Sequence, residues 1–228
     1  MLKNAVVLLS GGLDSSTTLA IAQAQGFNVK ALTIFYGQRN QVELDAARRV
    51  VKHFAVDKHQ VLDLDLRAFG GSSLTDSIEV LAHSEISSEA IPQTYVPARN
   101  TIMLSLALAY AEVNQAFDIF FGANIHDYSG YPDCRPHYVE AFEKMANLAT
   151  KSACEGGNKI TIHTPLINLT KAQIIKRGIE LGVDYSITHS CYDPVGDRAC
   201  GRCSACFYRT KGFKDADILD PTPYAATK

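Results

Sequence analysis

Residues 10–16 read Ser10-Gly11-Gly12-Leu13-Asp14-Ser15-Ser16, and this stretch decides how the rest of the chain is interpreted. It lies between a short apolar run, residues 5–9, and a segment with the spacing of a helix. Two adjacent glycines let the backbone turn sharply and approach a ligand without a Cβ in the way. The amides at the start of the following helix point outward, where the helix dipole also favours an anion. With serine hydroxyls as further donors, the stretch predicts a phosphate-binding loop.

The loop is not of the Walker A type, because Gly-x-x-x-x-Gly-Lys-Ser/Thr is absent and no lysine lies between Lys3 and Lys30. An ordinary strand-to-helix turn, with Ser15 or Asp14 as the N-cap, would need no ligand. The full Ser-Gly-Gly-x-Asp-Ser run is far more restrictive than its glycines alone. It also opens the first strand–helix unit, where open α/β sheets bind nucleotides. The motif therefore favours binding of a nucleotide's phosphates.

Strand-like and helix-like segments alternate along most of the chain. Apolar runs predict strands at residues 5–10, 29–36, 60–64, 118–122 and 159–163. Helical spacing predicts helices at residues 15–25, 42–54, 100–113, 138–150 and 171–181. The alternation predicts an α/β fold, a parallel sheet with helices on both faces. Because the helix at 100–113 is apolar on almost every face, we expect it to be buried. Residues 67–97, rich in Ser, Gly and Glu, predict a long loop with at most short helices.

Composition narrows the class of protein. Of the 228 residues, 46% are hydrophobic and 20% are charged, which is enough for a well-filled core. A net charge of −2 argues against a stable nucleic-acid partner. The apolar run at 5–9 is too short for a signal peptide, and the one at 102–111 is too short to span a bilayer. We expect a soluble, cytoplasmic protein with no membrane partner.

Four of the six cysteines crowd together near the C-terminus, as Cys191, Cys200, Cys203 and Cys206. Their Cys-x8-Cys-x2-Cys-x2-Cys spacing lets four thiolates converge on one tetrahedral ion. With all four positions filled by cysteine there is no open coordination site, so we expect a structural Zn²⁺. An iron–sulfur cluster is the competing interpretation, although the usual fourth Cys-Pro is missing. We interpret the isolated Cys134 and Cys154 as buried, inert thiols.

A second phosphate contact is predicted at Lys171, which follows a strand and opens a helix. A lysine there would supply a point charge for pyrophosphate. Lysines are most often solvated surface residues, but a cation at a helix N-terminus opposes the dipole, and this favours a functional role. Arg99, just before the helix at 100–113, is a weaker candidate, since a surface or ion-paired arginine is as plausible there.

The loop at residues 122–135 follows a strand, at the edge where open α/β sheets build active sites. It offers carboxylates at Asp127 and Asp133, a ring at Tyr131 and a guanidinium at Arg135. A planar heterocycle could stack on a ring while a carboxylate accepts two N–H bonds from a guanine-like edge. Composition alone would equally suit an ordinary polar loop.

At residues 10–16 the sequence resembles the PP-loop ATP pyrophosphatases. The resemblance implies their Rossmann-like fold, of the adenine nucleotide alpha hydrolase-like type, and cleavage of ATP between the α and β phosphates. It implies that ATP is bound by Leu9, by Ser10 through Ser16 and by Lys171. We expect catalytic roles for Ser10, Asp14, Lys171 and Arg99.

Further motifs occur in a fixed order after this loop: Phe35-Tyr36-Gly37-Gln38-Arg39, Tyr95-Val96-Pro97-Ala98-Arg99-Asn100, residues 127–135, and the four cysteines. Together, over residues 5–207, they resemble the 7-cyano-7-deazaguanine synthase family of queuosine biosynthesis. The order and spacing carry this resemblance, because none of these later motifs is specific alone. We therefore expect an ATP-binding and catalytic domain over residues 1–185, with a zinc-binding segment, residues 186–228, packed on it.

The resemblance implies an ATP-dependent carbon–nitrogen ligase that converts 7-carboxy-7-deazaguanine and ammonia to the nitrile, releasing AMP and pyrophosphate. It implies adenylation first of the acid and then of the amide, and a homodimer. Mg²⁺ would shield the phosphates, with Asp14 or Asp127 as candidate ligands. Since we find no glutaminase motif, we expect free ammonia as the nitrogen donor. The alternatives are another PP-loop amidating or tRNA-thiolating ligase, and a zinc-ribbon binding module that retains a nucleotide fold.

Overall fold

The computed structural model describes residues 2–38, 41–85, 91–125 and 131–226. Its centre is a five-stranded parallel sheet made of β1 (Asn4–Leu8), β2 (Asn28–Phe35), β3 (Lys58–Asp63), β4 (Asp118–Phe120) and β5 (Thr161–His163). The strand order is β3-β2-β1-β4-β5. The chain thus moves outward from β1 in one direction and then returns to its other side, which creates a switch point between β1 and β4. The predicted parallel α/β sheet is confirmed.

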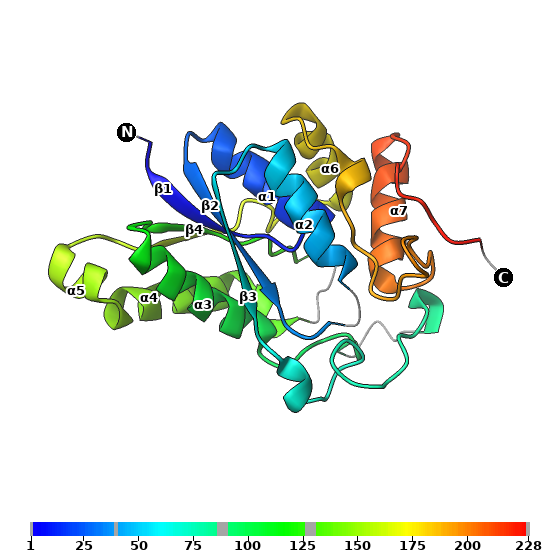
Figure 1. The fold of residues 1–228 in the computed structure, drawn as a ribbon, viewed down its shortest axis with the longest axis horizontal. Helices are drawn as coiled ribbons and strands as arrows, with labels where there is room; N and C mark the ends of the chain where they lie inside the picture. The colour runs from blue at the N-terminus through cyan, green and yellow to red at the C-terminus, as the bar shows by residue number, and fades with distance from the viewer. Residues whose placement is uncertain (1, 39–40, 86–90, 126–130, 227–228) are drawn as a thin grey trace.

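Helices cover both faces of this sheet (Figure 1). One face carries α1 (Leu13–Ala24) and α2 (Val42–His53), and the other carries α3 (Arg99–Val113) and α4 (Pro136–Ala149), which the short α5 (Lys151–Gly156) follows. Alternate residues of β1 pack into separate hydrophobic clusters on the two faces of the sheet. Val6 packs in the cluster that contains Leu104 of α3, while Val7 packs in the cluster that contains Leu19 of α1. This is the alternation that a strand buried on both faces requires.

One sequence expectation about α3 is wrong. Its inner side is buried, as at Leu104, but Ser105 and Ala109 are exposed and Val113 is 82% exposed. The reason is that α3 forms an outer layer on the sheet, so only one side of the helix finds a partner. The long loop is as expected, because among its described residues it holds only short 3-10 helices, Leu66–Ala68 and His83–Glu85.

The chain after residue 185 contains a helix that the sequence did not predict, α7 (Ser204–Ala216). It lies beside α6 (Lys171–Glu180), and Phe213 of α7 shares a core cluster with Ile174 of α6 and Leu13 of α1. The four clustered cysteines belong to the core that includes β1 and α3. This C-terminal part therefore packs against the sheet domain, and the boundary at residue 185 stays a prediction.

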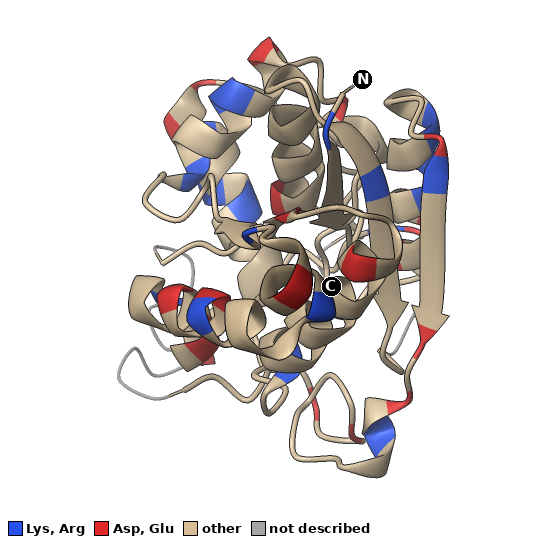
Figure 2. Ribbon diagram, turned by 90° about the vertical axis from the view of Figure 1, so that its left-hand side faces the viewer, with Lys and Arg blue, Asp and Glu red and all other residues tan. Residues whose placement is uncertain are grey.

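Acidic and basic residues are interspersed along the helices drawn in Figure 2, in keeping with the small net charge. Within the described ranges, the chain contains no helix with both the length and the apolar character needed to cross a bilayer.

Candidate active site

The loop between β1 and α1 depends on a glycine at position 11. Gly11 has a φ of +82°, in the left-handed region that side chains disfavour. A Cβ on Gly11 would also lie 2.3 Å from the backbone nitrogen of Ala47 in α2. Conformation and close approach therefore both demand glycine, and the tight contact holds the loop against α2.

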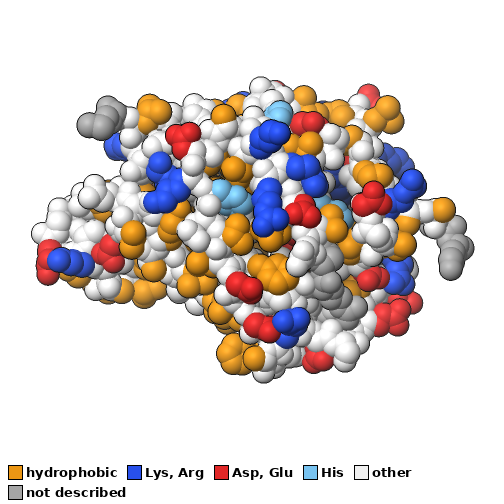
Figure 3. Space-filling view, viewed as in Figure 1, with side chains coloured by type: hydrophobic (Ala, Val, Ile, Leu, Met, Phe, Trp, Pro, Cys, Tyr) orange, Lys and Arg blue, Asp and Glu red, His pale blue; other side chains and the backbone are white. Residues whose placement is uncertain are grey.

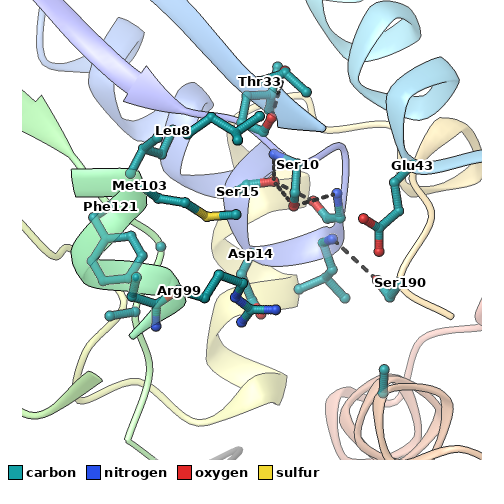
Figure 4. Close-up of a pocket in the computed structure, with 18 of the residues that line it drawn as sticks. Leu8, Ser10, Asp14, Ser15, Thr33, Glu43, Arg99, Met103, Phe121 and Ser190 are labelled. Atoms are coloured by element: carbon teal, nitrogen blue, oxygen red, sulfur yellow. Dashed lines mark hydrogen bonds between the residues drawn. The ribbon is translucent and has the colours of Figure 1, made fainter. Parts of the chain in front are cut away.

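Serine hydroxyls bind the loop to itself. The Oγ atoms of Ser10 and Ser15 lie 3.0 Å apart, and the Gly12 amide donates to Ser10 Oγ at 3.3 Å. The N-cap of α1 is Gly12, which has no side chain to accept a hydrogen bond from the first amides of the helix. The alternative interpretation, in which Ser15 or Asp14 is the N-cap and no ligand is needed, is therefore not what forms here. Figure 4 shows Ser10 and Ser15 at the end of β1, with Asp14 below them on α1. The loop presents a helix N-terminus and hydroxyls toward one space, as a phosphate site requires.

Lys171 meets this loop although it lies 157 residues later in the chain. Its Nζ donates to both carboxylate oxygens of Asp14, at 2.8 Å each. The side chain of Lys171 is only 12% exposed, so it is not the solvated surface residue of the alternative interpretation. Thr170 and Gln173 form a capping box at this helix end, which fixes where α6 begins and hence where Lys171 points.

The stem of Lys171 is enclosed by α7. At Gly212 of α7 an added Cβ would lie 2.2 Å from Lys171 Cγ and 2.8 Å from its Cβ. Glycine at this position is what allows α7 to approach so closely. One turn earlier, the buried Arg209 donates to the Tyr185 carbonyl at 2.9 Å and pairs with Asp220 at 3.1 Å. The C-terminal helix therefore forms a wall behind the predicted phosphate lysine.

A cavity of about 260 Å³ opens over the carboxyl ends of β1 and β2. Several predicted site residues line it: Leu9, Ser10, Gly12, Leu13, Asp14, Ser15, Arg99, Tyr131 and Lys171. Within the loop of residues 10–16, Gly11 and Ser16 do not line the cavity. Gly11 is buried against α2, and Ser16, fully buried, donates through its Oγ to the Gly12 carbonyl at 2.7 Å. Gly11 and Ser16 therefore hold the loop in its conformation from the side away from the cavity.

The loop after β4 is only partly in this cavity. Asp133 is 5% exposed and accepts from the backbone amide and Nδ2 of Asn100, at 3.2 and 3.1 Å. That carboxylate is committed to the N-terminus of α3. Arg135 is exposed, and neither it nor Asp133 lines the cavity. Asp127 lies outside the described residues. The substrate roles predicted for these three residues stay predictions.

Arg99 extends from the start of α3 over the ring of Tyr36, with its Cζ 5.6 Å from the ring centroid. Its Nη1 lies 3.4 Å from the Tyr36 hydroxyl. Burial alone would lower the pKa of Arg99, but the phenols of Tyr36, Tyr131 and Tyr192 raise it. Burial raises the pKa of Tyr36 to about 12. A fixed positive charge thus faces the cavity from the side opposite α2, as Figure 4 shows.

Glu43 is a cavity residue that sequence reasoning missed. It lies in the first turn of α2, and burial raises its pKa to about 7, against the opposing effects of Arg99 and Gln38. Gln38 Nε2 donates to Glu43 Oε2 at 3.1 Å. The available signal was its place just after β2, because residues beyond the carboxyl end of a strand build sites in such sheets. His189 was also missed; it lines the cavity, and no described residue hydrogen-bonds to its buried Nε2.

The Sγ atoms of Cys191, Cys200, Cys203 and Cys206 all lie within 4.8 Å of one another, and all four residues are buried. Hydrogen bonding from Cys191 and the other thiols lowers the pKa of Cys200, and Cys200 in turn raises the pKa of Cys191. Backbone amides of Arg202 and Cys203 also donate to Cys200 Sγ, at 3.4 Å each. A compact set of four sulfur donors, stabilised by N–H groups, fits a tetrahedral Zn²⁺.

The other two cysteines differ from the buried, inert thiols that we expected. Cys154 is exposed, and Cys134 is half-buried and lines the cavity. Asn100 Nδ2 lies 3.3 Å from Cys134 Sγ, within donor distance. The expectation failed because burial of an isolated cysteine depends on packing rather than on its neighbours in the sequence.

Comparison with known proteins agrees with this geometry. The family described as "Queuosine biosynthesis protein QueC" matches residues 4–217. A protein named 7-cyano-7-deazaguanine synthase from Paramagnetospirillum magneticum is 60% identical over 228 residues, which cover 99% of this chain and 100% of that protein. One of the same name from Desulfatibacillum aliphaticivorans is 59% identical, covering 97% of each chain.

Solved structures agree on the fold. A predicted subunit of tRNA methyltransferase from Methanocaldococcus jannaschii has a TM-score of 0.51 at 17% identity, covering 100% of this chain and 94% of that chain. NMN synthetase from Francisella tularensis has a TM-score of 0.51 at 15% identity, covering 100% and 90%. At such identities the likeness concerns the fold alone. The full-length sequence matches carry the assignment: this chain belongs to the QueC family of queuosine biosynthesis proteins.

Proposed function

We propose that this chain is an ATP-dependent carbon–nitrogen ligase that converts 7-carboxy-7-deazaguanine and ammonia to 7-cyano-7-deazaguanine. Family membership and the names of the relatives support this assignment. The structural observation that carries it is the meeting of Lys171 with Asp14 of the Ser10–Ser16 loop at one cavity. A cation and a helix N-terminus beside one space suit a departing pyrophosphate.

The chemistry follows from the weakness of a carboxylate as an electrophile. Attack of the carboxylate oxygen on the α-phosphorus of ATP forms an acyl adenylate and expels pyrophosphate. Ammonia then attacks the carbonyl carbon and displaces AMP, which gives the amide and one proton. In a second round the amide oxygen is adenylated, and loss of AMP and the remaining N–H protons leaves the nitrile. One loop serves both rounds, since each begins with the same bond cleavage in ATP.

Each residue has a role in this proposal. Hydroxyls of Ser10 and Ser15 and the amides that open α1 hold the pyrophosphate, and Lys171 neutralises its developing charge. Asp14 holds Lys171 in place before ATP arrives, through the pair at 2.8 Å. Arg99 faces the cavity as a second cation for the carboxylate or the phosphates. Mg²⁺, when bound, would shield the triphosphate.

We propose Zn²⁺ as a structural ion held by Cys191, Cys200, Cys203 and Cys206. Cys203 caps α7 and Cys206 lies in its first turn, so the ion would anchor the helix that supports Lys171. In this view residues 186–228 are a zinc-binding segment that completes the catalytic domain of residues 1–185.

The test is release of AMP and pyrophosphate from ATP by purified protein given 7-carboxy-7-deazaguanine and ammonium chloride. We expect two AMP per nitrile formed, and no release without the deazapurine. Lys171→Met should reduce turnover at least a hundredfold while leaving the melting temperature close to that of the native chain. No release with this substrate would reject the proposed function.

Free ammonia is the proposed nitrogen donor. The native chain should make the nitrile with ammonium salts and not with glutamine. Product formation with glutamine alone would contradict this part of the proposal. We also propose that the enzyme works in the cytoplasm, where ATP is supplied.

A homodimer is proposed through the outer side of α3 and α4. Val113 and Leu148 are 82% and 80% exposed there, and Met145 is exposed as well. Figure 3 shows apolar side chains along the edge of the molecule that these helices form. Light scattering should give twice the chain mass, and the double variant Val113→Glu, Leu148→Glu should give the single mass. A monomeric native chain would refute the dimer.

A further inference from the structure

The carboxylate of Glu43 is held in a defined orientation at the cavity wall. Gln38 Oε1 accepts from the Tyr36 backbone amide at 2.8 Å, which fixes the Gln38 side chain so that its Nε2 donates to Glu43 Oε2 at 3.1 Å. In the described part of the chain, Glu43 Oε1 makes no hydrogen bond. The orientation is therefore set by one oxygen, and the other is left as an acceptor at a cavity wall.

The other carboxylate and the side-chain amides of the wall, among the described residues, are already committed. Asp14 receives both of its bonds from Lys171. The Asn100 amide group donates to the buried Asp133, and that of Asn124 donates to the carbonyls of Leu166 and Leu169. Of the two carboxylates that the structure describes on the cavity wall, Glu43 is thus the one that no lysine or arginine neutralises by direct contact.

The geometry points to Glu43 as the residue that reads the guanine-like edge of the substrate. This inference rests on the proposed function, because it concerns the binding of a 7-deazaguanine. Such a ring carries N1–H and a 2-amino group side by side, and a carboxylate is the side chain that accepts from both. An oxygen already bonded to Gln38 still has a lone pair for a second donor.

The direction of the Glu43 side chain agrees with this role. Figure 4 shows Glu43 reaching from α2 and Arg99 from α3 toward the space beside Ser10 and Asp14. A ring between them would place its N–H edge at the carboxylate of Glu43 and its substituents toward the guanidinium and the phosphate loop. The sequence alone offered the carboxylates of the loop after β4 as candidates for reading the base, and of these Asp133 proves to be committed to α3.

The test compares 7-carboxy-7-deazaguanine with its analogue that lacks only the 2-amino group. Calorimetric binding to the native chain in the absence of ATP should favour the full substrate by about 10- to 100-fold, as loss of a hydrogen bond to a charged acceptor predicts. Glu43→Gln should reduce this preference to less than about threefold, because an amide offers one acceptor and sets an N–H against the substrate. Glu140→Gln, the same change at an exposed residue of α4, should keep the full preference.

Each outcome decides between this inference and its rivals. If Glu43→Gln weakens both ligands equally, or abolishes binding of both in a folded protein, the carboxylate does not read the 2-amino group and the inference is wrong. If it leaves the preference unchanged, the inference is equally wrong. If the native chain binds neither ligand, the proposed function fails rather than the role of Glu43. The melting temperature of each variant reports whether it is folded.

Discussion

Replacement of Gly212 by alanine tests whether the C-terminal helix positions Lys171, the lysine that we propose binds phosphate. In the native chain the stem of Lys171 passes directly over Gly212, where an added Cβ would lie 2.2 Å from Lys171 Cγ. Ordinary contacts between carbon atoms are about 3.5–4.0 Å. Gly212→Ala therefore requires a shift of roughly 1.5 Å, either of the Lys171 stem or of α7. Neither shift leaves the Lys171 ammonium in its place beside Asp14.

The expected effects on stability and on activity differ in size. Crowding of a packed site costs about 1–3 kcal/mol, while exchange of glycine for alanine within a helix recovers about 1 kcal/mol. Gly212→Ala should thus be destabilised by no more than about 2 kcal/mol, or under about 8 °C in melting temperature for a chain of this length. A catalytic group displaced by about 1 Å can cost about a hundredfold in rate. Turnover should therefore fall far more than stability.

Pyrophosphate release at saturating deazapurine, with ATP varied, measures the effect, and thermal melting measures the fold. Lys214→Ala is the matched control, because it also places alanine in α7 but at an exposed position away from Lys171. We expect native kinetics for Lys214→Ala and a loss of about a hundredfold in kcat/KM for ATP with Gly212→Ala. Native kcat and KM in a folded Gly212→Ala protein would refute the idea that α7 positions Lys171.

Three further predictions concern the loop, the metal site and pH. Gly11→Ala should lower the free energy of unfolding, measured in urea, by more than about 3 kcal/mol, because it combines a φ of +82° with a Cβ 2.3 Å from the backbone. The control Gly26→Ala, with a φ of +84° but open space around the added Cβ, should lower it by only about 1 kcal/mol. Equal losses for the two variants would contradict this reasoning. Elemental analysis should find one zinc per chain, and Cys203→Ser should lower both the zinc content and the melting temperature. A zinc-free protein with the melting temperature of the native chain would count against the zinc site. Burial raises the pKa of Glu43 from 4.5 to about 7. Between these two pH values the carboxyl is protonated in the folded chain and ionised in the unfolded chain, so the free energy of unfolding falls as the pH rises through this range. Relative to the native chain, Glu43→Gln should raise the free energy of unfolding by up to about 3 kcal/mol at pH 8 and leave it unchanged at pH 4. The same increase at both pH values would exclude burial of the carboxylate as the cause.

The sequence by itself determined the parts of this protein that depend on local backbone requirements. The run from Ser10 to Ser16 needs glycine where the chain turns, and apolar runs alternating with helical spacing predict a parallel sheet. These features were confirmed, as was the grouping of the four cysteines, whose short separations let one loop and the start of one helix bring them together.

Tertiary structure alone decided which distant side chains share the site. The pairing of Lys171 with Asp14 joins positions 157 residues apart, and it depends on how α6 and α7 pack beside α1. Packing also assigned Asp133 to the N-terminus of α3 and left Glu43 at the cavity. Both carboxylates follow a strand, so their sequence contexts look alike. The neighbours that bury a carboxylate, and the donors that claim it, come from other segments, and only the folded chain brings them together.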